Sequence, residues 1–187
     1  MNWNWPNTLT VGRIVFIPFF VLLFYIQPLL SQYQINLLAT VIFVLASITD
    51  WLDGYLARRL QQTSNFGAFL DPVADKLMVT VALILLVELD RVGAVIAFII
   101  IGREIAISAL REWMAGLGKS SSVAVAMVGK LKTIAQMIAI PFLLYDMPLL
   151  GINIHLVGHV LILIAAFLTL LSMAYYLKAA LPTLRGH

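Results

Sequence analysis

Long apolar runs separated by short polar segments dominate the hydropathy pattern of this chain. No charged residue occurs from Ile14 to Thr49, and the polar segment 31–36 divides this run into two stretches that are each long enough to cross a bilayer. A third uncharged run lies between Asp146 and Lys178. These runs predict membrane-spanning helices at 9–30, 35–59 and 155–178.

The middle of the chain contains three shorter uncharged runs, at 77–87, 92–102 and 133–145. None of them can cross a hydrocarbon core alone, so each must extend into its charged neighbours. The extended runs predict helices at 66–88, 92–115 and 123–145. We therefore expect residues 1–187 to form a single all-α integral membrane domain with six transmembrane helices and both termini on one side.

Composition and charge placement agree with a membrane protein. Hydrophobic residues make up 62% of the chain and charged residues 11%, with a mean hydropathy of +1.00, so the chain lacks the polar surface of a soluble globule. The absence of cysteine excludes disulfides and thiolate metal sites. The positive-inside rule predicts that both termini are cytoplasmic, because that side would carry six basic residues: Arg13, Arg58, Arg59, Lys119, Lys178 and Arg185.

Four aspartates lie in sequence that is otherwise expected to be membrane-embedded. Asp50 and Asp53 are three residues apart in the second predicted helix, and Asp71 and Asp75 are four apart in the third, so each pair shares a helix face. Both pairs lie at the cytoplasmic ends of consecutive antiparallel helices. Carboxylates that converge in this way repel one another unless they are protonated or bridged by cations. Oxygen ligands favour Mg²⁺ or Mn²⁺, and Mg²⁺ commonly shares them with substrate phosphates.

Small and basic residues accompany these carboxylates. Gly54, Ala57 and Gly67 would let a bulky group approach the backbone, and the Arg58 guanidinium is suited to a phosphate. Two alternatives are a structural network that neutralises nearby arginines and lysines, and an ion or proton pathway. No polar trail leads from the aspartates to the far side of the membrane, which disfavours the pathway.

The spaced pattern as a whole resembles the signature of the CDP-alcohol phosphatidyltransferase family at all eight of its defined positions. The matching residues are Asp50, Asp53, Gly54, Ala57, Arg58, Gly67, Asp71 and Asp75. The similarity covers nearly the whole chain. It implies transfer of the phosphatidyl group from CDP-diacylglycerol to sn-glycerol 3-phosphate, which gives phosphatidylglycerol phosphate and CMP, by a homodimer in the bacterial inner membrane with its active site facing the cytoplasm.

The resemblance also implies roles for individual residues. Two Mg²⁺ or Mn²⁺ ions would be held by the four aspartates, with Asp75 also the general base, while Gly54, Ala57, Arg58 and Gly67 would line the CDP-diacylglycerol site. No serine or cysteine with a partner base is evident, so we expect direct displacement without a covalent enzyme intermediate.

An acceptor that carries its own phosphate needs a second cationic pocket. The fourth and fifth predicted helices offer Arg103, Arg111, Lys130 and Lys132. The alternative for Arg111, Lys130 and Lys132 is snorkelling to lipid headgroups, whereas Arg103 lies too deep to do so easily. Charge alone does not separate glycerol 3-phosphate from inositol phosphate, although it disfavours serine as the acceptor.

Two uncharged polar residues and three charged ones have roles that we expect from their positions on the helices. Asn7, Thr10 and Arg13 recur every three residues in the first predicted helix and would face the nucleotide, although Asn7 is equally suited to capping the helix. Glu104 is expected to hold an arginine in position. Lys76 points about 100° away from Asp75 around the helix, so we expect it to serve at the membrane interface or in ion pairing.

Overall fold

The computed structural model describes the backbone of residues 5–26, 29–60, 65–116 and 126–184, and most side chains within 11–50, 73–114 and 127–178. Helices account for nearly all of these residues and no strand is formed among them, so the all-α prediction is confirmed there. The elements are α1 (Trp5–Leu22), the 3₁₀ helix η1 (Leu23–Tyr25), α2 (Gln32–Leu60), α3 (Asn65–Glu88), α4 (Ala94–Gly116), α5 (Ala126–Tyr145) and α6 (Ile154–Leu184).

The observed helices follow the predicted ones closely, with differences at their ends. Helix α1 ends at Leu22 instead of residue 30, and α6 continues to Leu184 instead of residue 178. Pro28 lies shortly after α1 in the sequence, and a residue that precedes a proline is disfavoured in the α region. The apolar run 14–30 is therefore not one continuous helix.

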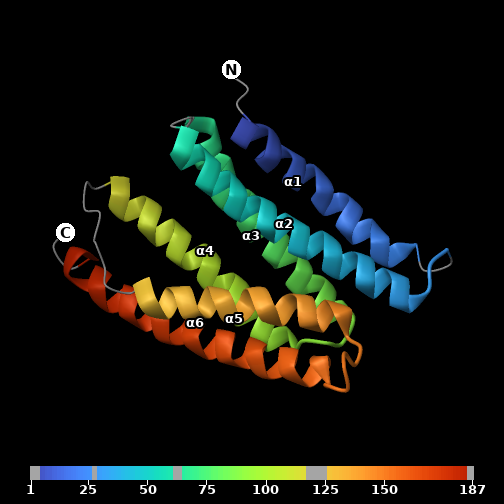
Figure 1. The fold of residues 1–187 in the computed structure, drawn as a ribbon. Helices are drawn as coiled ribbons and strands as arrows, with labels where there is room; N and C mark the ends of the chain where they lie inside the picture. Colours follow the sequence, from blue (N-terminus) through green and yellow to red (C-terminus); the bar gives the residue numbers. More distant parts are fainter. Residues whose placement is uncertain (1–4, 27–28, 61–64, 117–125, 185–187) are drawn as a thin grey trace.

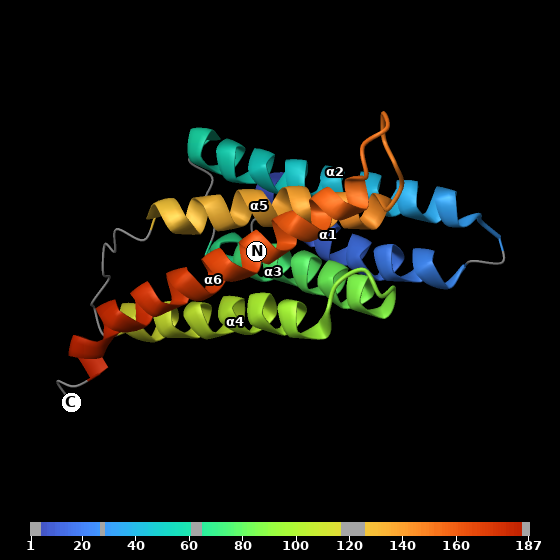
Figure 2. The same ribbon diagram turned by 90° about the horizontal axis from the view of Figure 1, so that it is seen from below.

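The helices alternate in direction along the bundle (Figures 1 and 2). Helices α1, α3 and α5 begin at one end of the bundle, and α2, α4 and α6 finish there. Helix α5 packs extensively along α6, and α1 packs between α2 and α3. Asp50 near the end of α2 and Asp75 in the first half of α3 consequently lie toward the same end of the molecule.

Large apolar side chains cover much of the outer surface of the described helices. Phe16, Phe98 and Phe167 are each at least 60% exposed, which is typical of contact with lipid tails rather than water. Two helical stretches, Gln32–Asp50 and Ile154–Lys178, are long and apolar enough to cross a membrane. These features agree with membrane association, while the count of six spans stays a prediction.

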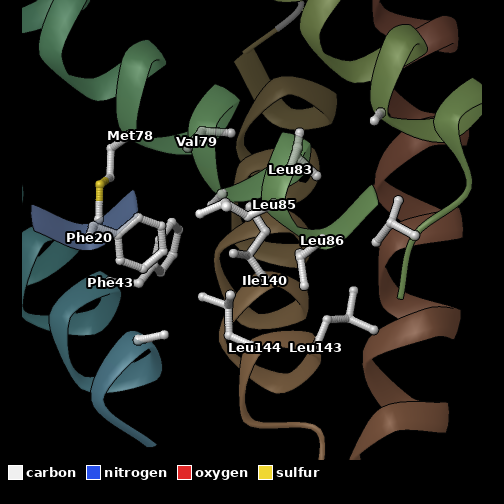
Figure 3. Close-up of a cluster of buried hydrophobic side chains, with 14 of the residues drawn as sticks. Phe20, Phe43, Met78, Val79, Leu83, Leu85, Leu86, Ile140, Leu143 and Leu144 are labelled. Carbon is white, nitrogen blue, oxygen red and sulfur yellow. The ribbon is translucent and has the colours of Figure 1, made fainter. Parts of the chain in front are cut away.

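Apolar side chains from α1, α2, α3 and α5 form a buried cluster between the helices (Figure 3). Phe20 of α1 and Phe43 of α2 lie beside Met78 of α3, and all three are buried. Farther along, Leu86 of α3 packs near Leu144 of α5. These side chains fill the space between the helices with hydrocarbon.

Arg91 closes the end of the bundle opposite the aspartates. It lies in the turn between α3 and α4, where its Nη1 donates hydrogen bonds to the carbonyl oxygens of Leu143 (3.1 Å) and Leu144 (2.8 Å) in the last turn of α5. Its Nε lies 3.0 Å from Oδ2 of Asp146. Burial lowers the pKa of Arg91, and the Asp146 carboxylate opposes that shift. The arginine therefore caps carbonyl groups that the helix leaves without partners.

Close packing between α5 and α6 depends on Gly158. A Cβ atom at this position would lie 2.9 Å from Cγ of Leu143 and 3.1 Å from Cβ of Phe142. Leu143 is fully buried, so it has little room to move. The glycine is needed here because the neighbouring helix approaches its backbone.

We predict that Gly158→Ala lowers the thermal unfolding temperature of the purified protein in detergent, through an overpacking cost of about 1–3 kcal/mol. Gly102→Ala in α4 is the matched control, because a Cβ at Gly102 meets no atom within 4 Å. This role of Gly158 is contradicted if both variants unfold at the wild-type temperature, or if Gly102→Ala lowers the unfolding temperature more than Gly158→Ala does.

Candidate active site

A cavity of about 960 Å³ lies between α3, α4, α5 and α6. One part of its wall is apolar, with Ile100 and Ile101 of α4 and Ile134 and Met137 of α5. The other part carries charged and polar side chains from all four helices. These are Asp75, Lys76 and Thr80 of α3, Arg103 and Glu104 of α4, Lys130, Lys132, Thr133 and Gln136 of α5, and Tyr176 of α6.

An ion-pair cluster occupies the wall between α4 and α5. The ammonium of Lys132 contacts Oε1 of Glu104, and Nη1 of Arg103 lies 3.5 Å from the same oxygen. Lys132 and Arg103 are both buried, with 4% and 5% of their surface exposed. One carboxylate thus holds two cations from neighbouring helices, which agrees with the expectation that Glu104 positions an arginine.

Helix α6 supplies two further contacts to Arg103. Its Nη2 donates a hydrogen bond of 2.9 Å to the Ser172 hydroxyl. The guanidinium carbon lies 5.5 Å from the centre of the Tyr176 ring, within the range of a cation–π interaction. Neither Ser172 nor Tyr176 was among the residues expected to take part in the site.

Lys76 lines the same cavity, and its expected role at the membrane interface or in ion pairing stays a prediction. Its ammonium donates a hydrogen bond to the Ser108 hydroxyl, which in turn donates to the backbone oxygen of Glu104 at 2.7 Å. The cavity is wide enough to be lined by neighbouring positions of α3, so Asp75 and Lys76 both border it. The angle of about 100° between Asp75 and Lys76 around α3 therefore does not exclude Lys76 from the cavity.

The described lining residues leave an excess of positive charge in the cavity. Four basic side chains (Lys76, Arg103, Lys130 and Lys132) face two acidic ones (Asp75 and Glu104), a formal excess of two positive charges. Charges at this depth are costly unless they are paired or functional. The cavity is therefore suited to an anionic ligand with about two negative charges.

Asp50 and Asp75 both line a second, smaller cavity that also borders Arg13. Nη1 of Arg13 contacts Oδ1 of Asp50, and this arginine from α1 is buried. Arg13 was expected to face the nucleotide, and the structure places it on an aspartate of the predicted metal site. Asp75 borders both cavities, so it connects the aspartates to the basic pocket.

The remaining predicted residues lie on the described helices, but their side chains are outside the described residues. The backbone of Asp53, Gly54, Ala57 and Arg58 belongs to α2, that of Gly67 and Asp71 to α3, that of Asn7 and Thr10 to α1, and that of Arg111 to α4. Their assigned roles stay predictions.

The chemistry of Asp50 and Asp75 fits a hard divalent cation. Both supply carboxylate oxygens at one small cavity, and such oxygens are the preferred ligands of Mg²⁺ and Mn²⁺. Among the side chains that the structure describes, no group of three or more potential ligands lies close enough to form a metal site. Asp53 and Asp71 would have to complete it.

Helical spacing offered a weak signal for the residues that were not expected. Lys76 and Thr80 are four apart, as are Lys132 and Gln136, and Ser172 and Tyr176, so each pair shares a helix face. The first two pairs border the cavity, and Tyr176 does so as well. A serine in an apolar helix is common enough that Ser172 carried no functional signal by itself.

Comparison with known proteins gives a consistent family assignment. Residues 3–171 match the model of the CDP-alcohol phosphatidyltransferase family. The chain is 50% identical over 182 residues, 96% of each chain, to the CDP-diacylglycerol–glycerol-3-phosphate 3-phosphatidyltransferases of Shigella flexneri serotype 5b and Escherichia coli K12. The chain therefore belongs to the CDP-alcohol phosphatidyltransferase family.

Proposed function

We propose that this protein transfers the phosphatidyl group of CDP-diacylglycerol to sn-glycerol 3-phosphate, which gives phosphatidylglycerol phosphate and CMP. The choice of acceptor is supported by the cavity beside Asp75, because its described lining residues have an excess of two positive charges. Relatives that are 50% identical over 96% of the chain bear the name of this activity.

We further propose that residues 1–187 form one membrane domain of six spans in the bacterial inner membrane, with both termini and the active site at the cytoplasmic face. The alternating helix directions bring the ends of α2, α4 and α6 to one end of the bundle, as this topology requires (Figure 1). A homodimer is part of the proposal through the family resemblance alone.

On the donor side, Asp50, Asp53, Asp71 and Asp75 would hold two Mg²⁺ or Mn²⁺ ions. Bound there, such ions neutralise the phosphate oxygens and stabilise the departing CMP. Gly54, Ala57 and Gly67 would leave room for the cytidine diphosphate, with Arg58 on its charge and Asn7 and Thr10 as further polar contacts. The contact between Arg13 and Asp50 supports a role for Arg13 in holding that carboxylate.

The chemical step needs only residues of this chain for proton transfer. A hydroxyl oxygen of glycerol 3-phosphate attacks the diacylglycerol-bearing phosphorus, its proton passes to Asp75, and the bond from that phosphorus to CMP breaks. The electrons of the broken bond leave with CMP. The position of Asp75 supports this role, because Asp75 borders both the smaller cavity that Asp50 lines and the larger cavity with the basic side chains.

On the acceptor side, Arg103, Lys130, Lys132 and Arg111 would bind the phosphate of glycerol 3-phosphate. A phosphate monoester carries close to two negative charges near neutral pH, which would offset the excess of two positive charges in the described cavity. A neutral acceptor or a zwitterion such as serine would leave those charges uncompensated. Inositol phosphate satisfies the same charge argument and remains the rival acceptor.

A screen of acceptors tests this function. Purified protein in detergent micelles with CDP-diacylglycerol and Mg²⁺ should release CMP with glycerol 3-phosphate, and much less with inositol phosphate, serine, glycerol or water. Removal of divalent metal with a chelator should stop the release. Release of CMP with inositol phosphate but not with glycerol 3-phosphate would mean that inositol phosphate is the acceptor. No CMP together with metal flux into vesicles would instead favour a cation transporter.

We predict that Lys132→Met raises the KM for glycerol 3-phosphate by about tenfold or more, because a charge-assisted contact to phosphate is lost, and leaves the KM for CDP-diacylglycerol nearly unchanged. Steady-state kinetics with each substrate varied in turn measures both values. Lys178→Met, on the exposed surface of α6, is the matched control.

Loss of Lys132 also removes the closer of the two cations that contact Glu104 and leaves it the longer contact to Arg103. The variant that combines Lys132→Met with Glu104→Gln therefore separates binding from folding. The double variant should melt closer to the wild type and still show the raised KM. Equal increases in the two KM values would mean that the acceptor pocket is misplaced.

For Asp75→Asn we expect kcat to fall by about 10²–10⁴-fold, because the amide cannot accept the proton of the attacking hydroxyl. Both KM values should change much less, the pattern of a group that acts mainly in the transition state. If activity is fully restored by raising the Mg²⁺ concentration, Asp75 is a metal ligand and not the base.

A further inference from the structure

We infer that Ser172 and Tyr176 of α6 are positioning residues that orient Arg103 toward the acceptor phosphate and thereby set the affinity for the phosphorylated acceptor. The inference rests on the proposed function, because it takes Arg103 to be a phosphate-binding residue. Helix α6 thus contributes to substrate selection in addition to its role as an apolar helix of the bundle.

The hydrogen bond from Arg103 to Ser172 fixes one edge of the guanidinium. Nη2 of Arg103 donates to Ser172 Oγ at 2.9 Å, and the Ser172 hydroxyl donates onward to the backbone oxygen of Thr169 at 2.9 Å. The serine hydrogen is thus committed to its own helix, so its oxygen serves as an acceptor for the arginine. Ser172 is fully buried and Arg103 is 5% exposed, so water does not compete for either group.

The ring of Tyr176 lies against the same guanidinium. Tyr176 lies one helical turn beyond Ser172 and borders the cavity, with its ring centre 5.5 Å from the guanidinium carbon of Arg103. A guanidinium over an aromatic face gains cation–π attraction, and this attraction strengthens where water is excluded. The serine holds Arg103 through a hydrogen bond, and the tyrosine holds it through a ring contact.

These two contacts differ in kind from the third one, to Glu104. Oε1 of Glu104 lies 3.5 Å from Nη1 of Arg103 and also contacts Lys132, so it offsets part of their charge. Ser172 and Tyr176 are neutral, so they orient the guanidinium without offsetting it. An arginine that is held in place before the ligand arrives loses less conformational freedom on binding. The α6 contacts should therefore appear as affinity for the phosphate.

Removing either contact tests this. We expect Ser172→Ala and Tyr176→Leu each to raise the KM for glycerol 3-phosphate by about five- to tenfold, with the KM for CDP-diacylglycerol within about twofold of the wild type. Tyr176→Phe keeps the ring and should raise this KM less than Tyr176→Leu does. Tyr175→Leu is the matched control, because the neighbouring Tyr175 is 51% exposed and does not border the cavity.

A double variant separates positioning from simple packing. Arg103→Lys loses the planar group that Ser172 and Tyr176 hold, so adding Ser172→Ala to it should raise the KM for glycerol 3-phosphate little further. Thermal unfolding in detergent, measured on every variant, shows whether a variant is folded. If Ser172→Ala fails to fold, the KM for glycerol 3-phosphate of Tyr176→Phe is compared with that of Tyr176→Leu instead.

The positioning role is overturned if Ser172→Ala and Tyr176→Leu leave the KM for glycerol 3-phosphate unchanged, raise both KM values alike, or add fully to Arg103→Lys. It is also overturned if Tyr176→Phe is as impaired as Tyr176→Leu. These outcomes require an active wild type. A wild type that releases no CMP with glycerol 3-phosphate would instead overturn the proposed function.

Discussion

The contact between Lys132 and Glu104 is the interaction on which the basic cavity depends. A buried ammonium is costly unless a counter-charge lies against it, and the Glu104 carboxylate from α4 supplies that charge while also approaching Arg103. The pair lets α4 and α5 present cations inside the bundle. Because two carboxylates face four basic side chains among the described lining residues, the pairing is incomplete. This surplus suits the cavity to an anion.

The bundle divides its length between packing and chemistry. Hydrocarbon from α1, α2, α3 and α5 fills one half, with Phe20, Phe43 and Leu86 buried within it (Figure 3). Arg91 closes that end by capping the last carbonyls of α5. The other half holds Asp50, Asp75 and the basic cavity. A rigid apolar half keeps the polar side chains at fixed distances, which catalysis by positioned groups requires.

Much of this arrangement could be predicted from the sequence, because charged residues are costly in membrane-embedded helices and therefore indicate functional positions. Uncharged runs predicted six helices that the structure has within a few residues, except at the end of α1 and the extension of α6. Arg103, Lys130 and Lys132 were expected to share a pocket, and they line one cavity. Periodicity assigns a residue to a helix face but not to a neighbour, so the partners of Arg13 and Lys76 were not foreseen. Ser172 and Tyr176 were missed because uncharged polar residues are common in apolar helices.

In the proposed function, the phosphate of the acceptor offsets the excess positive charge of the cavity. Calorimetric titration of the purified protein with sn-glycerol 3-phosphate, and separately with glycerol, measures this without catalysis. We expect saturable binding of glycerol 3-phosphate that weakens about tenfold or more in Lys132→Met, and no detectable binding of glycerol. Equal binding of the two compounds, or binding of glycerol 3-phosphate that is unchanged in Lys132→Met, would contradict it.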